Sequence, residues 1–60
     1  MNYELRRRIE LHLKRTGIAP TRFGRDVCRD QHLLKDMRNG RVPGAGITNK
    51  IIAYLEANGQ

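Results

Sequence analysis

The most constraining feature of this sequence is the spacing of its apolar residues, which recur every three or four positions in short segments separated by Gly and Pro. Such spacing places apolar side chains on one face of an α-helix, whereas a half-buried strand would alternate apolar and polar residues. We find no segment with the alternation of a strand. The pattern therefore predicts an all-α protein built from short helices.

Helix-starting and helix-ending residues divide the first half of the chain. Leu5, Ile9 and Leu13 share one face of a helix expected over residues 2–16, and Gly17 is expected to end it. A second helix is expected to open at Pro20, a position where the missing N–H of proline costs nothing.

Gly24 lies inside this second helix, between the inward residues Phe23 and Val27. A glycine within a helix costs about 1 kcal/mol relative to alanine, so its presence suggests the close approach of another backbone.

Two more helices are predicted in the second half. Asp30 is a good N-cap for a third helix over residues 31–39, with Leu34 and Met37 facing inward and Gly40 ending the helix. After a loop rich in Gly and Pro, a last helix is expected over residues 47–58, with a broad apolar face that includes Ile47, Ile51 and Leu55.

Length and charge limit the class of protein. Sixty residues predict a single domain spanning residues 1–60. Twelve Lys and Arg against six Asp and Glu give a net charge of +6, which favours a polyanion as partner. Residues 47–60 carry only one basic and one acidic side chain, so the basic surface belongs to the earlier segments.

The composition also predicts where the chain resides. A single cysteine cannot form an internal disulfide and fits a reducing compartment. No apolar run approaches the ~20 residues that would cross a bilayer, and the first residues are charged rather than apolar. The first helix has a narrow apolar face without Trp or Phe, so core packing explains it better than a membrane surface. We therefore expect a cytoplasmic protein, associated with the nucleoid if it binds DNA.

The second and third predicted helices lie close together in the sequence and share inward apolar residues. Two short helices joined by a tight turn are the layout of a helix-turn-helix, here over about residues 20–39. In DNA-binding proteins of this kind the second helix of the pair enters the major groove.

The run "APTRFGRDVCRDQHLLKDMRNGR", residues 19–41, resembles the lambda-repressor-like, Cro-type helix-turn-helix family of bacteria and their phages. The resemblance implies a compact four-helix domain that regulates transcription by binding double-stranded DNA, most often as a repressor. Carried over by position, it implies that Gln31 is the first residue to contact a base and that His32 and Lys35 occupy the next outward positions. Asn39 matches a residue that bonds the DNA backbone.

Side-chain chemistry suggests roles for the candidate residues. Gln31 can pair with adenine, Lys35 can donate to guanine, and Asp36 can accept from cytosine. His32 can donate to a base or a phosphate. Candidate contacts to phosphate, which set the register on DNA but carry no sequence information, are Thr21, Arg22, Arg29, Arg38, Asn39 and Arg41.

Two functions compete with the binding of double-stranded DNA. A helix-turn-helix can also serve as a protein-interaction adaptor or antitoxin-like module, but apolar residues would then be expected on the outward face of residues 31–39. Binding of single strands needs exposed aromatic side chains, which are scarce here. One recognition helix makes few base contacts, so we expect a homodimer on a palindromic site, with the last helix as the first choice of contact.

Catalysis is not expected. No Ser-His-Asp order or pair of carboxylates points to an active site, and Cys28, His12 and His32 do not have the spacing of a zinc site. Cys28 is expected to be a small apolar residue behind the turn, and His12 a packed side chain. We therefore predict no enzyme activity, metal, cofactor or small-molecule ligand.

Overall fold

Residues 3–58, the part of the chain that the computed structural model describes, form helices and contain no strand. The helices are α1 (Tyr3–Thr16), α2 (Pro20–Cys28), α3 (Leu33–Arg38) and α4 (Ala45–Ala57). The prediction of an all-α protein with four helices is confirmed for this part. The first residue of the predicted helix over 2–16 lies outside the described residues. None of the described helices combines the length and the apolar character that crossing a bilayer requires.

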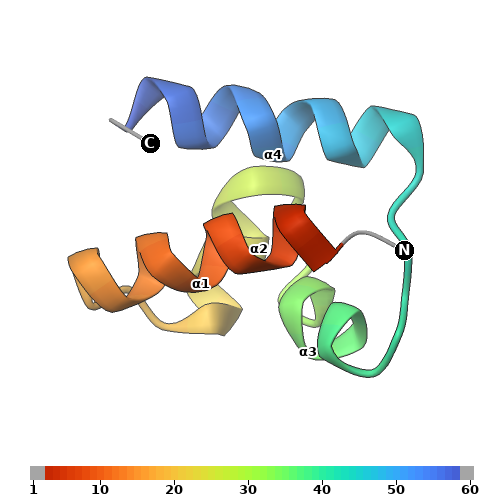
Figure 1. The fold of residues 1–60 in the computed structure, drawn as a ribbon, viewed down its shortest axis with the longest axis horizontal. Helices are drawn as coiled ribbons and strands as arrows, with labels where there is room; N and C mark the ends of the chain where they lie inside the picture. Colours follow the sequence, from red (N-terminus) through yellow and green to blue (C-terminus); the bar gives the residue numbers. More distant parts are fainter. Residues whose placement is uncertain (1–2, 59–60) are drawn as a thin grey trace.

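The four helices pack around one core, and Figure 1 shows how they are arranged. In this view α1 and α4 run in the same direction across the molecule, α2 lies between them, and α3 lies below the start of α1. Helix α2 packs against both α3 and α4, and α3 also packs against α1. The ends of α1 and α4 are connected by a hydrogen bond of 3.2 Å from Arg15 Nη2 to the carbonyl oxygen of Asn58.

Every helix contributes apolar side chains to one core. Helix α3 is short but contributes Leu33, Leu34 and Met37, so one whole side of it is buried. Val27 and Cys28 are partly buried and pack against this core. The fully or nearly fully buried apolar side chains are Leu5, Ile9, Leu13, Phe23, Leu33, Leu34, Met37, Ile51 and Leu55. The inward positions predicted for α1 and for the third helix are thus confirmed.

Three rings connect α1, α2 and α4 within the core. The ring of Phe23 lies edge-on to that of Tyr54, with centroids 5.3 Å apart. His12 packs against both, at 6.0 Å from Phe23 and 5.6 Å from Tyr54. The His12 side chain is therefore packed, as predicted, and is buried to 1% exposure.

Two glycines end helices as predicted. Gly17 has φ +76° and Gly40 has φ +102°, values that favour glycine because it lacks a Cβ. The N–H of Gly17 donates to the carbonyl oxygen of Leu13 at 2.8 Å, which continues the hydrogen bonding of α1 past its last residue.

Two predicted helix starts are wrong by two residues. The third helix begins at Leu33 and ends at Arg38, so the predicted range 31–39 is too long, and His32 rather than Asp30 is its N-cap residue. The last helix begins at Ala45 rather than at residue 47, because the carbonyl oxygen of Gly44, its N-cap residue, already accepts a hydrogen bond from the N–H of Thr48 at 2.9 Å.

Candidate nucleic-acid interface

The turn between α2 and α3 is built on an unusual backbone conformation. Arg29 has φ 57° and ψ 30°, the left-handed region that a residue with a Cβ rarely adopts. Its N–H donates to the carbonyl oxygen of Arg25 at 2.9 Å, which ends α2. Because residue 29 is not a glycine, no local sequence pattern predicts that α2 ends here.

The close approach predicted at Gly24 is confirmed. A Cβ on this residue would overlap the carbonyl oxygen of Asp30 and would also crowd Leu33. The N–H of Asp30 donates to the carbonyl oxygen of Gly24 at 3.1 Å. The turn therefore packs directly on the backbone of α2, which holds α3 close to α2.

Gln31, His32 and Lys35, the three central candidates for base contacts, are all exposed. Gln31 and His32 belong to the turn before α3 and not to a helix, contrary to the prediction. The reason is that Asp30 Oδ1 accepts a hydrogen bond of 2.9 Å from the N–H of His32, while the N–H of Leu33 bonds the Asp30 carbonyl oxygen at 3.1 Å. These two bonds close a turn before the helix begins.

Arg41 lies between two carboxylates. Its Nη1 atom donates to Asp30 Oδ2 at 3.0 Å and to Asp36 Oδ2 at 3.2 Å. The hydrogen bond from Arg41 is the main cause that lowers the pKa of the Asp30 carboxyl, and the same bond raises the pKa of Arg41. Two candidates from the sequence, Asp36 and Arg41, are thus bound to each other in the free protein.

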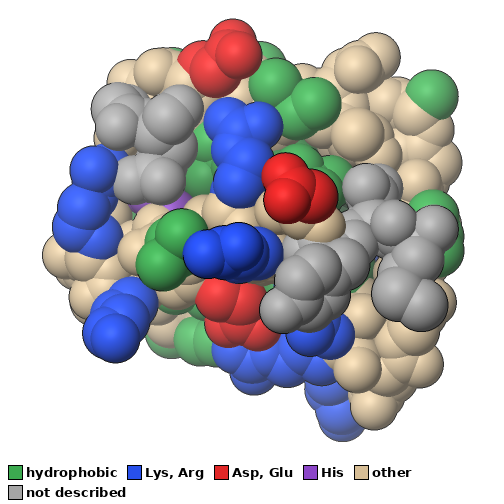
Figure 2. Space-filling view, in the orientation of Figure 1, with side chains coloured by type: hydrophobic (Ala, Val, Ile, Leu, Met, Phe, Trp, Pro, Cys, Tyr) green, Lys and Arg blue, Asp and Glu red, His purple; other side chains and the backbone are tan. Residues whose placement is uncertain are grey.

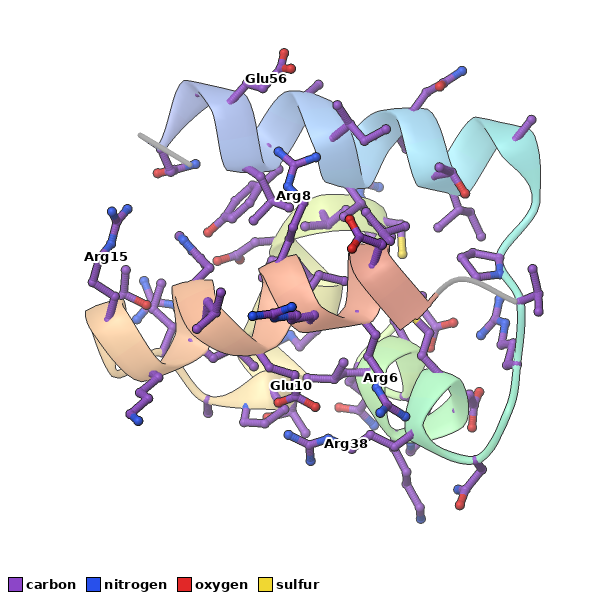
Figure 3. All side chains as sticks on the ribbon, in the orientation of Figure 1. Arg6, Arg8, Glu10, Arg15, Arg38 and Glu56 are labelled. Atoms are coloured by element: carbon purple, nitrogen blue, oxygen red, sulfur yellow. The ribbon has the colours of Figure 1, made fainter. Side chains whose placement is uncertain are left out.

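Arg38 is bound to α1. Its Nε donates to Glu10 Oε2 at 2.8 Å and its Nη2 to Glu10 Oε1 at 2.7 Å, a bidentate pair whose side chains point toward one another in Figure 3. The hydrogen bonds from Arg38 lower the pKa of Glu10, and the charge of Arg6 contributes to the same direction. Nothing in the local pattern indicated this pair, since its members lie far apart in the sequence.

The remaining candidates for phosphate contacts lie on the surface of α2, in the turn after α2 and at the end of α3. Thr21, Arg22, Arg29 and Asn39 are all exposed. Arg22 Nε lies 3.6 Å from Asp26 Oδ2, one turn along the same helix. For Arg29 and Lys35 no ion pair is found with another described residue.

Basic side chains are not confined to α3. Figure 2 shows Lys and Arg spread over the face that α1 presents, with carboxylates among them. This distribution suits attraction to an extended polyanion more than the binding of a single small anion.

His12 and Cys28 both lie wholly or partly inside the fold. Cys28 is half-buried, and both ring nitrogens of His12 are buried with no hydrogen-bond partner among the described residues. Within residues 3–58, no group of three or more His, Cys, Asp or Glu side chains is placed to hold a metal ion.

Comparison with known proteins gives no relative for this chain: no protein-family model, no curated protein and no solved structure matches it. The resemblance of residues 19–41 to the lambda-repressor-like family stays a prediction.

Proposed function

We propose that this chain is a regulator of transcription that binds double-stranded DNA at specific sequences. In this proposal α2, the turn 29–32 and α3 act as a helix-turn-helix of the lambda-repressor-like kind. Gln31, His32 and Lys35 contact bases in the major groove.

One observation carries the proposal: α3 buries one side completely while the side chains around its start and outer face are exposed and polar. Leu33 and Leu34 have no exposed surface, so the helix cannot rotate about its axis without losing the core. Lys35 is therefore presented outward in a fixed orientation, and the exposed Gln31 lies in the turn just before the buried Leu33. Glutamine and lysine carry the donors and acceptors that discriminate base pairs in the major groove.

Phosphate contacts are assigned first to Thr21, at the start of α2, and to Arg29, in the turn after α2, because both are exposed. Arg29 can approach a phosphate without giving up a carboxylate partner, because no ion pair links it to another described residue. Arg22 would exchange its partner Asp26 for a phosphate, which costs little because exposed ion pairs are weak. These contacts would set the register of α3 on the duplex.

The exposed apolar residues support DNA over a protein partner at this face. The large apolar side chains that stay exposed in the described part are Leu11 and Val42, at 53% and 59%. Neither belongs to residues 31–39, where an adaptor would need an apolar surface.

We infer a homodimer that represses by occupying a palindromic site. Helix α4 is our choice for the dimer contact because Lys50 and Glu56 are its only charged residues. Two chains of net charge +6 would repel each other least across a neutral surface.

The test is selection of bound duplexes from a random DNA pool at about 150 mM salt, a concentration that weakens nonspecific contacts. We expect an enriched palindrome with half-sites about one helical turn apart. Gln31→Ala should flatten the preference at one position of each half-site, and Lys14→Ala, in the last turn of α1, should leave it unchanged.

Other outcomes are equally informative. A single enriched half-site would keep base recognition and remove the homodimer. No enrichment with the intact chain would overturn the proposed function, and a protein partner would then be sought at the same surface.

A further inference from the structure

Asp30 uses every one of its polar groups in hydrogen bonds around the start of α3. Its N–H donates to Gly24 in α2 and its carbonyl oxygen accepts from the N–H of Leu33, both at 3.1 Å. Its Oδ1 atom accepts from the N–H of His32 at 2.9 Å, and its Oδ2 atom accepts from Arg41 at 3.0 Å. A single residue thus connects α2, the turn, the first residue of α3 and the segment after α3.

Arg41 completes this cluster from the other end of α3. Besides its two carboxylate partners, its N–H donates to the carbonyl oxygen of Asp36 at 2.9 Å. The chain after α3 therefore folds back along the helix and reaches the turn that precedes it. We call Asp30, Asp36 and Arg41 together the clasp.

The segment that the clasp spans has little helical stability of its own. Helix α3 has six residues, and isolated helices shorter than ~12–15 residues are marginal in water. Gln31 and His32 are exposed and belong to a turn, so no core packing fixes their backbone. The bonds of Asp30 within the turn and the bridge to Arg41 do so instead.

We propose that Asp30 and Arg41 are positioning residues for base recognition: by closing the clasp they fix the turn from which Gln31 and His32 reach the bases. This rests on the function proposed above. It replaces the role expected for Arg41 from the sequence, because a guanidinium held by two carboxylates positions the turn and does not neutralise a phosphate.

The test compares Arg41→Gln with Lys14→Gln, which removes the same charge from an exposed position in the last turn of α1, and with Arg41→Lys. Each protein is bound to the selected duplex, to duplexes altered at one position, and to an unrelated duplex, over a range of salt concentrations. Hydrogen exchange of the His32 amide in the free proteins reports whether the turn has opened.

We expect Arg41→Gln to lose affinity for the selected duplex about tenfold, which is of the order that one well-formed base contact contributes. Its affinity for the unrelated duplex should change less than about threefold, and the slope of log affinity against log salt should match that of Lys14→Gln. The His32 amide should exchange faster in Arg41→Gln than in the intact chain or in the matched control variant. Arg41→Lys should keep part of the base preference that Arg41→Gln loses.

A uniform loss on all duplexes, with a salt slope smaller in magnitude by about one than that of Lys14→Gln, would make Arg41 a phosphate contact and overturn the positioning role. An unchanged base preference in Arg41→Gln would overturn it as well. If the intact chain itself shows no preference among duplexes, the proposed function fails first, and this outcome is distinct because it appears before any variant is compared.

Discussion

The carbonyl oxygen of Asp30 occupies the space that a Cβ on Gly24 would need. The contact joins the middle of α2 to the turn before α3, and it is accompanied by the hydrogen bond from the Asp30 N–H to the Gly24 carbonyl oxygen. The glycine inside α2 is thus explained by a backbone that must pass directly over it.

Gly24→Ala should therefore destabilise the protein, although alanine is the better helix former by about 1 kcal/mol. The overlap is with backbone, which cannot rotate away, so we expect a net loss of about 1–3 kcal/mol, as for other overpacked sites. Gly46→Ala in α4 is the control, because a Cβ there meets nothing within 4 Å. Urea unfolding of both variants measures the difference, and equal stability of the two would mean that the turn can move away from α2.

The pair of Glu10 and Arg38 should make stability depend on acid pH. The pKa of Glu10 lies below its ordinary value of 4.5 because Arg38 bonds the carboxylate. A lowered pKa in the folded state means that the contribution is complete above about pH 4.5 and is lost as the pH falls through the folded value. The pair is partly exposed, so it should contribute at most about 1 kcal/mol.

Unfolding of the intact chain and of Glu10→Gln, measured across this pH range, checks the contribution. The intact chain should be the more stable at neutral pH, and the difference should shrink as the pH falls below about 4.5. A difference that stays constant with pH would show that Glu10 stabilises the fold by packing and not by its charge. Asp30, whose pKa is lowered mainly by its bond to Arg41, titrates in both proteins and cancels in the comparison.

Helix ends set by glycine were predictable, because that signal is local. Gly17 and Gly40 adopt positive φ where the sequence indicated that helices stop. The apolar faces were predictable for the same reason, since the spacing of Leu34 and Met37 already determines which side of α3 can be buried.

The start of α3 and the charged pairs were not predictable from local patterns. Aspartate is a residue type that commonly caps helix N-termini. The side chain of Asp30 instead accepts a hydrogen bond from the N–H of His32, in a turn that precedes the helix. Arg38 and Arg41 looked like two similar surface cations, and only the tertiary arrangement brings one to Glu10 and the other to a pair of aspartates. The exposure of Gln31 and Lys35 agrees with the positions expected of base contacts, while their roles stay predictions.

Lys35→Ala should change which base is preferred at one position of the DNA site. Lys35 is exposed on α3 and can donate to guanine, so its loss should reduce the discrimination at that position by about 1–3 kcal/mol. Binding to duplexes that differ only at this position measures the effect. If every duplex weakens equally, Lys35 contacts a phosphate instead.

Arg29→Gly should separate stability from DNA binding. Glycine adopts the left-handed backbone of this position without strain, so the variant should be more stable by about 0.5–1 kcal/mol. If Arg29 contacts a phosphate, the same variant should bind all duplexes more weakly, with a salt slope smaller by about one. Greater stability with an unchanged slope would remove Arg29 from the interface, and lower stability would contradict the strain inferred from its φ of 57°.

The buried ring of His12 offers a test of the core. Its nitrogens have no hydrogen-bond partner among the described residues, and an unsatisfied buried polar group costs about 1–3 kcal/mol. Leucine has a similar volume and no polar atoms, so His12→Leu removes the cost of the unsatisfied nitrogens. It also loses the ring contacts with Phe23 and Tyr54. The net result should be a free energy of unfolding that is higher by about 1 kcal/mol at neutral pH.

His12→Ala is the matched variant, because it removes the same nitrogens but leaves a cavity, and it should destabilise the fold by about 2 kcal/mol or more. Opposite signs for the two variants in urea unfolding would show that the ring serves as packing volume between α1, α2 and α4. Destabilisation by both would mean that the ring nitrogens are satisfied in solution, with a buried water as the simplest partner.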